Sequence, residues 1–556
     1  MKPYNLFQHV VRISLMVYIC MAAGCVTKDE PPAGIPVTPR DTTITEHNAV
    51  TLLQIDSLAV QRYLDSARVS DTSRQLISNF YNSRNYQYAW FDEKGLTEHA
   101  AMLWNLYRDY AEYGPRVPAA DSMLRQHMER WLTDTMRQVM GASAKSAELQ
   151  LTQLFFDYAF AKYMGNLDPA DLQWYIPRRK VNVTALLDSL VAGRQPVDDW
   201  EPLHPQYRLL RHQLLTYTGI ADRGGWDSVF FQKKSKLSVG DCDSGVVRLK
   251  RRLQATGQFP NGDTSACFTR SLRDSLIGVQ RQFGLQADGV VGASTLDALN
   301  VRVERRIEQI LVNMERMRWL PRQPEGTWIL ANIPSFRLQV FEGDSSVMRM
   351  NIVVGTAATR TVIFSDELKY IVFSPYWNVP ASIVRHEIVP ALRRDSNYLR
   401  RSRMEQTGTR NGLPVIRQLP GPGNALGQVK FLFPNNYNIY LHDTPAKSYF
   451  GETSRAFSHG CVRVSRPYEL AKFLLRSDTT WTERDIRAAM HAGKEKWVAL
   501  SETVPVFLTY FTAWVADGHL QFRKDIYGHD ERMKRHLFSR NDDALSGMSR
   551  PTSLSR

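Results

Sequence analysis

Residues 456–467 read "AFSHGCVRVSRP", and here a cysteine lies among a histidine, a glycine and an arginine. A thiol attacks as its thiolate, which is scarce at neutral pH unless a base assists. His459 lies two positions before Cys461, and side chains two apart on an extended chain share a face. The stretch therefore predicts a cysteine nucleophile with a histidine beside it.

A second histidine lies upstream in "NIYLHD", residues 438–443. Side chains alternate along an extended segment, so Ile439 and Leu441 point one way while Tyr440 and His442 point the other. If the apolar pair faces the core, His442 faces a cleft. We expect it to lie across from Cys461 and to act as a base.

The residues around the cysteine supply the other parts of an acyl-transfer site. Gly460 lets a substrate approach the backbone, and the N–H groups of Gly460 and Cys461 could stabilise an oxyanion. A helix is expected to begin near Pro467, and a helix start favours a nearby anion. Arg463 offers a forked donor that suits a carboxylate.

A metal site is the competing chemical interpretation of the same residues. Histidine and cysteine are common zinc ligands, so His442, His459 and Cys461 could bind zinc. No fourth ligand with suitable spacing is evident in the sequence. We therefore predict no metal and no other cofactor.

Outward from this motif, alternating patterns typical of strands begin at residue 326 and indicate a β-rich catalytic domain over residues 301–530. Asp517-Gly518 separates two strand-like runs and predicts a hairpin. A basic insertion at about residues 382–428 starts with a helical pattern and ends in a Gly/Pro-rich loop; it is expected to cap the site. The polar, Ser-rich residues 531–556 are expected to be disordered.

Two helical regions precede the strands. Residues 51–230 carry helical periodicity without a polar cluster that looks catalytic, which indicates a helical scaffold domain. Residues 237–300 predict a compact unit of three short helices, with a turn at Asp288-Gly289. The fold class is therefore multidomain α+β.

The N-terminus predicts export. Lys2 and Arg12 precede an apolar run at residues 13–24 that is too short to span a bilayer, so residues 1–24 resemble a signal peptide. The net charge of +14 favours an anionic partner.

The small residues before Cys25, "MAAGC", resemble a bacterial lipobox, in which this cysteine is lipidated; the family pattern usually has a large aliphatic residue where Ala22 stands. Plain secretion is the alternative. Residues 25–50 are rich in Pro and Thr and indicate a flexible tether. "KDE" at residues 28–30 loosely resembles acidic signals for export to the cell surface. An exported compartment permits a Cys242–Cys267 disulfide, which the sequence leaves open.

Two resemblances unite these observations. "GD…VxxLxxxL" and "FG…DGVVGxxTLxxLN" within residues 237–300 resemble the small peptidoglycan-binding domain of cell-wall enzymes. His442, followed by "SHGCVR" at residues 458–463, resembles the signature of the L,D-transpeptidase catalytic domain. The order of domains over residues 60–530 is similar to the large Gram-negative branch of that family, with a helical scaffold, a peptidoglycan-binding domain and a capped catalytic domain.

The resemblance implies roles for single residues. Cys461 is the nucleophile, His442 is the base, oriented by a backbone carbonyl near Asp443, and His459 and Gly460 shape the oxyanion site. The residues that would bind substrate or line the cleft are Arg463, Ser458, Tyr440, Trp377 and Asn424.

It also implies a reaction. Cys461 attacks the bond between diaminopimelate and the terminal D-Ala of a tetrapeptide stem, and the acyl group passes to another stem as a 3→3 cross-link. Carbapenems would acylate the same cysteine. Such an enzyme acts in cell-wall organisation and cell shape at the periplasmic face of a Gram-negative membrane, with the outer membrane favoured for a lipid-anchored protein. Its partners are diaminopimelate-containing stem peptides and the membrane, not nucleic acid.

Two other functions stay open on the sequence. If water replaces the amine, the protein is an L,D-carboxypeptidase or a cross-link hydrolase. A wall-binding lipoprotein with an inactive catalytic domain is the non-enzymatic alternative, although His442, Gly460 and Cys461 are all retained. The acceptor and the oligomeric state do not follow from the sequence.

Overall fold

The structure is a computed structural model that describes most of the chain in seven stretches. They are residues 35–67, 69–133, 142–178, 180–193, 203–232, 234–321 and 324–538. Cys25 and the predicted signal peptide lie outside these stretches.

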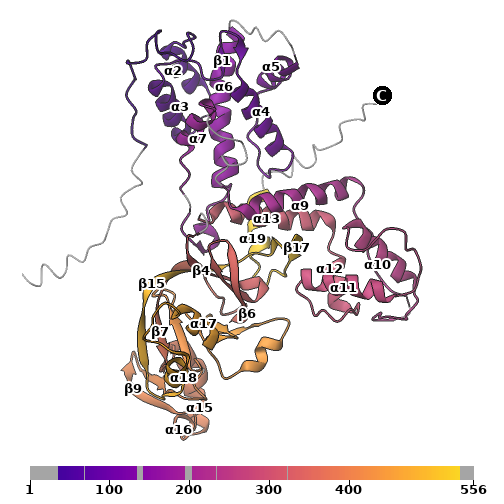
Figure 1. The fold of residues 1–556 in the computed structure, drawn as a ribbon, viewed down its shortest axis with the longest axis vertical. Helices are drawn as coiled ribbons and strands as arrows, with labels where there is room; N and C mark the ends of the chain where they lie inside the picture. Colours follow the sequence, from indigo (N-terminus) through magenta and orange to yellow (C-terminus); the bar gives the residue numbers. More distant parts are fainter. Residues whose placement is uncertain are drawn as a thin grey trace, which may run out of the picture. The chain divides into compact units, whose positions relative to one another are not determined.

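The chain folds into two compact units, and the first is helical (Figure 1). It holds the described parts of Met1–Tyr107, Pro118–Tyr158 and Asn182–Gln195. Its elements are α2 (Ser57–Ser66), α3 (Asp71–Ser83), β1 (Phe91–Asp92), β2 (Gly95–Leu96), most of α4 (Glu98–Ala111), α5 (Ser122–Thr133), nearly all of α6 (Ala142–Ala159) and α7 (Val183–Val191). The helical scaffold that the sequence predicts is present here, but the segments 108–117, 159–181 and 203–230 belong to the second unit.

Within the predicted tether at residues 25–50, residues 36–41 hydrogen-bond to α3. Thr38 N–H donates to Asn79 Oδ1 at 2.9 Å, and Asp41 N–H donates to the Asn82 carbonyl at 2.9 Å. Asn79 and Asn82 on α3 donate in turn to the carbonyls of Pro36 and Thr38. Polar side chains near the end of α3 therefore hold this part of the chain, which composition alone could not reveal.

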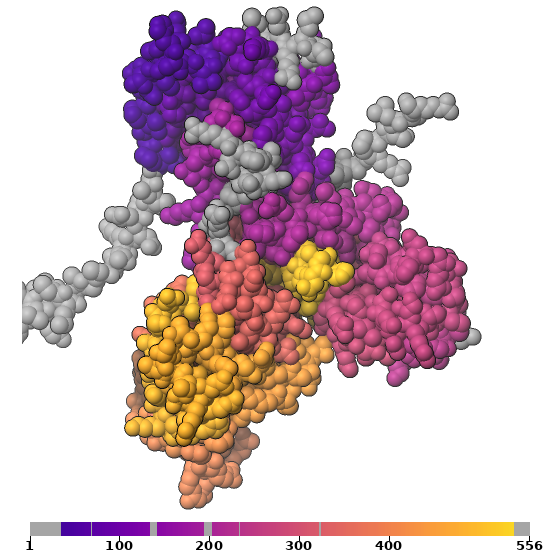
Figure 2. All heavy atoms as spheres, in the orientation of Figure 1, coloured from indigo at the N-terminus to yellow at the C-terminus, as the bar shows by residue number. Residues whose placement is uncertain are grey.

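The second unit contains a small module of three helices, which we call the binding module (residues 234–300). It comprises α10 (Ser244–Ala255), α11 (Arg270–Gln282) and α12 (Ala293–Leu299), and it forms a lobe of its own in Figure 2. The predicted faces of α10 and α11 form its core, because Leu249, Leu253 and Leu276 are fully buried. Cys242 and Cys267 form a disulfide, which answers the question that the sequence left open. Two longer helices flank the module in sequence, α9 (Pro205–Asp222) and α13 (Val303–Trp319).

The catalytic sheet closes on itself. Its strands follow the order β11-β12-β14-β6-β5-β4-β15-β7, and β11 also pairs with β7. Their bounds are β4 (Thr327–Asn332), β5 (Arg337–Glu342), β6 (Ser345–Gly355), β7 (Ile363–Phe373), β11 (Val429–Leu432), β12 (Leu441–His442), β14 (Val462–Val464) and β15 (Lys496–Thr509). Two short strands extend it: β3 (Trp174–Tyr175) pairs with β7, and β13 (Ala456–Ser458) pairs with β6. The β-rich domain is confirmed, although β3 comes from the segment predicted as scaffold.

Smaller elements complete this domain. The helices are the 3₁₀ turns η3 (Ile333–Ser335) and η5 (Lys447–Gly451), α17 (Pro467–Leu474) and α18 (Glu483–His491). The predicted hairpin is present as β16 (Ala513–Ala516) and β17 (His519–Phe522). Asp517 and Gly518 both have positive φ, of 51° and 73°, as a two-residue hairpin turn requires.

The cap is a small subdomain with its own core, built around the side chains of Val379, Ile383, Val384, Ile388 and Ile416. Its elements are β8 (Trp377–Asn378), α14 (Ala381–Ile383), the π-helix η4 (Val384–Ile388), α15 (Val389–Arg394), α16 (Tyr398–Arg401), β9 (Met404–Arg410) and β10 (Leu413–Gln418). Three strands form a separate sheet in the order β8-β10-β9. The sequence predicted the helical start but missed the β9–β10 hairpin.

The predicted disorder from residue 531 is wrong up to Phe538. Residues His529–Phe538 form α19, and Asp530 on this helix pairs with Arg316 of α13 at 2.7 Å. Thr512 Oγ1 also donates to Asp530 at 2.6 Å. Burial of this ion pair fixes the helix, and the partner comes from more than 200 positions away, beyond the reach of local pattern.

Replacement of Asp530 should destabilise the protein strongly. Asp530→Ala leaves the Arg316 guanidinium buried without its carboxylate, which costs about 3–5 kcal/mol of unfolding free energy. Glu531→Ala, at the exposed next position, is the matched control and should cost less than about 0.5 kcal/mol. Urea unfolding of the second unit measures both. Equal, small effects would show that the Arg316–Asp530 pair does not hold α19.

Candidate functional site

The turn that carries the cysteine follows β13 and leads into β14, which lies beside β12. The two strands run parallel, with Leu441 opposite Val462 and His442 opposite Arg463. Extending this register by one residue places Tyr440 opposite Cys461, and Val462 N–H donates to the Tyr440 carbonyl at 3.2 Å. Residues opposite each other share a face of a sheet, so these four side chains project from one face.

The face opposite to this one is the apolar core. Ile439 and Leu441 are buried, with exposed fractions of 5% and 0%, as the alternation in "NIYLHD" predicted. Core packing of this apolar pair therefore sets the direction in which Tyr440 and His442 point.

His442 is held as a neutral base. Its Nδ1 lies 2.5 Å from the Asp443 carbonyl, and a carbonyl only accepts, so Nδ1 carries the proton and Nε2 keeps a lone pair. Burial, and then the Arg463 charge, lower the pKa of His442 to about 3. The imidazole is therefore uncharged at neutral pH and able to accept a proton at Nε2.

Cys461 is the one free cysteine of the described residues. Its thiol donates to the Asn438 carbonyl at 3.6 Å. Burial raises the pKa of Cys461, while hydrogen bonds from Tyr440 and the Arg463 charge act in the opposite direction. The site at rest therefore holds a neutral thiol and a neutral imidazole, not an ion pair.

Ser458 fixes the shape of the turn. It is 2% exposed, its Oγ donates to the Cys461 carbonyl at 2.6 Å, and it accepts from Gly460 N–H at 3.2 Å. Gly460 has φ 115°, a region that side-chain-bearing residues rarely adopt. Gly460 N–H is thus engaged, whereas Cys461 N–H makes no hydrogen bond to another described residue and is the better oxyanion donor.

A loop from another part of the chain braces this turn, and sequence analysis missed it. Thr359 Oγ1 donates to the Ser458 carbonyl at 2.9 Å and Thr361 Oγ1 donates to the Gly460 carbonyl at 2.8 Å. A Cβ at Gly355 would lie 2.0 Å from the Thr359 carbonyl, so the loop needs glycine there. The threonines of "VVGTAATRT" after an apolar strand were the available signal.

Arg463 supplies an unpaired cation on the face that also carries Cys461 and His442. Its buried Nε has no hydrogen-bond partner among the described residues, and no described carboxylate forms an ion pair with it. Burial lowers the pKa of Arg463, yet a guanidinium stays charged at neutral pH. A carboxylate on a substrate would satisfy it.

His459 points to the cap. Its Nε2 lies 3.0 Å from Glu387 on η4, and both side chains are about half exposed. The pair joins the cap to the turn that carries Cys461. His459 therefore lies next to the nucleophile in sequence while its ring contacts the cap.

Two further predicted residues take different positions. Trp377 is half-buried against the cap core, at the base of the cap. Asn424 is 2% exposed, and its Nδ2 donates to the Pro375 and Leu419 carbonyls, each at 3.0 Å. These bonds tie the Asn424 loop to the segment after β7, and the lining of the cleft by Asn424 stays a prediction.

The described residues hold no group of three or more His, Cys, Asp or Glu side chains arranged to hold a metal ion. None of their helices combines the length and apolar character that crossing a bilayer requires.

Three family models match consecutive parts of the chain. The L,D-transpeptidase catalytic domain (YkuD) matches residues 326–483, a scaffold domain matches residues 75–214, and a domain described as "Putative peptidoglycan binding domain" matches residues 242–299. The chain therefore contains an L,D-transpeptidase catalytic domain together with scaffold and peptidoglycan-binding domains, and Cys461, His442 and Arg463 all lie within the catalytic match.

One relative is a protein of Haemophilus influenzae with the name "Putative L,D-transpeptidase". It is 32% identical over 242 residues, which cover 41% of this chain and 49% of the relative, so the match spans about half of that protein.

Crystal structures of L,D-transpeptidases from Xylanimonas cellulosilytica and Stackebrandtia nassauensis are similar at 16% and 14% identity. Each match covers 50% of this chain and 98% of the other, with TM-scores of 0.17 and 0.21.

Alkylation should report the resting state of Cys461. Because burial raises the pKa of the thiol, its reaction with iodoacetamide should be slow at pH 7 and rise steadily above pH 8. Tyr440→Phe removes a hydrogen bond to the sulfur, so the rise should move to higher pH. Intact-protein mass measures the rate, with Cys461→Ala as the blank. A rate already maximal at pH 6 would show a preformed thiolate and contradict the neutral pair.

Proposed function

We propose that this chain is a cysteine-dependent L,D-transpeptidase that forms 3→3 cross-links in peptidoglycan. The observation that carries the proposal is the common face of Cys461, His442 and Arg463, set by the parallel pairing of β12 with β14. On this face a nucleophile, a neutral base and an unpaired cation converge. The matching catalytic family supplies the class of reaction.

Acylation follows from the protonation states. The Cys461 thiol passes its proton to Nε2 of His442 as sulfur attacks the carbonyl between diaminopimelate and the terminal D-Ala. The oxyanion forms near Cys461 N–H, and its collapse breaks the amide bond. His442 returns the proton to the leaving amine, so D-Ala departs and a thioester remains. Arg463 suits a carboxylate of the stem.

Deacylation decides between transfer and hydrolysis. The side-chain amine of a second stem attacks the thioester, His442 takes the proton from the amine, and the thiol is regenerated with a new amide. Water in place of the amine gives an L,D-carboxypeptidase or a hydrolase, which is the second candidate. The cap, linked to the site by Glu387 and His459, is the element placed to control which of them enters.

Export and anchoring complete the proposal. Lipidation of Cys25 would hold the enzyme at the periplasmic face of a Gram-negative membrane, where peptidoglycan lies. The peptidoglycan-binding family match supports a wall substrate. A tether without activity is the non-enzymatic alternative.

Product masses test the reaction. The protein is incubated with a disaccharide-tetrapeptide that contains diaminopimelate, and we expect a dimer that lacks one D-Ala. Cys461→Ala should abolish it, and His442→Ala should lower its rate by at least about a hundredfold, the usual contribution of a general base.

The other products separate the alternatives. Tripeptide monomer alone would show hydrolysis, and no change of substrate would favour the tether. A dimer formed equally well by Cys461→Ala would overturn the mechanism.

A further inference from the structure

A cationic cavity lies where the binding module meets the catalytic domain within the second unit. We call it the junction cavity, and its volume is about 640 Å³. Its walls come from Arg281 and the loop at residues 283–287 of the module, from residues 334–337 and 451–455, and from Arg523, Lys524 and Ile526. None of these residues belongs to the proposed catalytic set.

The charges around the cavity do not balance. Five cations line it, Arg281, Arg337, Arg455, Arg523 and Lys524, and its one acidic residue is Glu452. Among the described residues, none of these six side chains forms an ion pair. Elsewhere in the same unit the buried Arg316 and Arg318 pair with Asp530 and Glu315, whereas the buried Arg252 and Arg306 donate to carbonyls.

Two of the arginines are fixed in place by carbonyls, which leave their charge uncompensated. Arg455 is 9% exposed and donates to the Ile352 and Phe336 carbonyls at 3.3 and 3.1 Å. Arg523 donates to the Gln282 carbonyl of the module at 2.6 Å. Rigid guanidinium groups lose little freedom when an anion binds.

The positive charges of Arg337, Arg455 and Arg523 repel one another. Burial, and then the Arg337 charge, lower the pKa of Arg455 to about 10. The same two causes, followed by the Arg455 charge, lower the pKa of Arg523 to about 10. An anion in the cavity would relieve this repulsion.

The backbone beside the cluster adopts conformations that are uncommon for residues with side chains. A Cβ at Gly284 would lie 2.5 Å from Arg523 Nε, and its φ of +69° already favours glycine. Phe336, whose carbonyl accepts from Arg455, has φ 53°, an uncommon conformation for a residue with a side chain. Strain of this kind gathers at functional sites.

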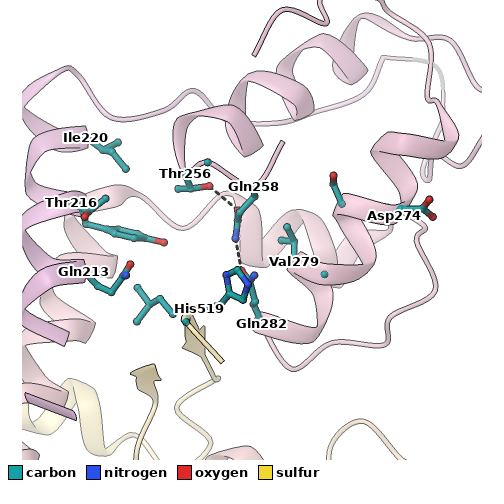
Figure 3. A pocket seen from close by; sticks show the side chains of 15 residues that line it. Gln213, Thr216, Ile220, Thr256, Gln258, Asp274, Val279, Gln282 and His519 are labelled. Carbon is teal, nitrogen blue, oxygen red and sulfur yellow. Dashed lines mark hydrogen bonds between the residues drawn. The ribbon is translucent and has the colours of Figure 1, made fainter. Parts of the chain in front are cut away.

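A neighbouring cavity of about 500 Å³ is lined by no lysine or arginine. It lies between α9, the module and the β16–β17 hairpin (Figure 3). Three of its polar side chains bond to one another, because Thr256 donates to Gln258 at 2.7 Å and Gln258 donates to Gln282 at 2.6 Å. No class of ligand follows from it, whereas the junction cavity calls for an anion.

We propose that the junction cavity binds a carboxylate-bearing stem peptide of peptidoglycan, as a second site for the polymer apart from the catalytic face. Guanidinium groups bind carboxylates in a bidentate manner, and a cavity of this size holds a short peptide rather than an ion alone. The identity of the ligand rests on the proposed function, since both sites then hold the same polymer. A phosphate-bearing ligand shares the charge and is the alternative.

Co-sedimentation with purified peptidoglycan sacculi tests the site without any turnover. The full chain with Cys461→Ala is compared with the same chain carrying Arg337→Gln and Arg523→Gln. We expect binding at least about tenfold weaker in the altered chain. Arg62→Gln, an exposed arginine on α2 in the first unit, is the matched control and should bind as before.

Arg337 provides a variant that does not disturb packing, because its side chain is exposed. Arg337→Glu should weaken binding more than Arg337→Lys does, and thermal unfolding should show both folded. Unchanged binding in Arg337→Glu and in the double variant would overturn the proposal.

Competition identifies the ligand. A soluble stem tripeptide should displace sacculi from the chain with intact arginines, and its fully amidated form should not. Displacement by inorganic phosphate and not by the tripeptide would overturn the carboxylate assignment in favour of a phosphate site. Because the assay needs no catalysis, an arginine-dependent interaction would stand even if the proposed reaction failed.

Discussion

The parallel pairing of β12 with β14 is the constraint on which the site depends. It sets His442 opposite Arg463 and Tyr440 opposite Cys461, so this register fixes the face from which the four side chains project. A slip of β12 by one residue would turn Tyr440 and His442 into the core. Burial of Ile439 and Leu441 on the other face of β12 opposes such a slip, and the Ser458 hydrogen bonds hold the turn before β14.

The motif itself could be predicted because its parts are local. Alternation along "NIYLHD" and the spacing of "SHGC" are short-range properties, and they indicated the nucleophile, the base and the face that they share. The Asp517-Gly518 turn was equally local. The β9–β10 hairpin had the same kind of signal at Asn411-Gly412, with φ of 51° and 75°, and it was missed inside a basic, Gly/Pro-rich insertion.

What the sequence did not predict depends on partners far along the chain. α19 is held by Arg316, residues 36–41 are held by Asn79 and Asn82, and the catalytic turn is held by Thr359 and Thr361. Composition indicated a disordered tail from residue 531 and a flexible tether before residue 50. Polar residues whose hydrogen bonds go to distant groups have the same composition as polar residues exposed to water. The net charge of +14 likewise gave no hint that five cations line one cavity, or that Arg463 lies beside Cys461 without a carboxylate partner among the described residues.

The proposed mechanism requires a covalent bond between Cys461 and the stem, and trapping that bond tests it most directly. Intact-protein mass spectrometry after rapid mixing with the disaccharide-tetrapeptide, followed by peptide mapping, would locate it. The account predicts an added mass equal to the substrate less D-Ala, on the peptide that contains Cys461, and none in Cys461→Ala. Turnover without any adduct, or an adduct on another residue, would contradict it.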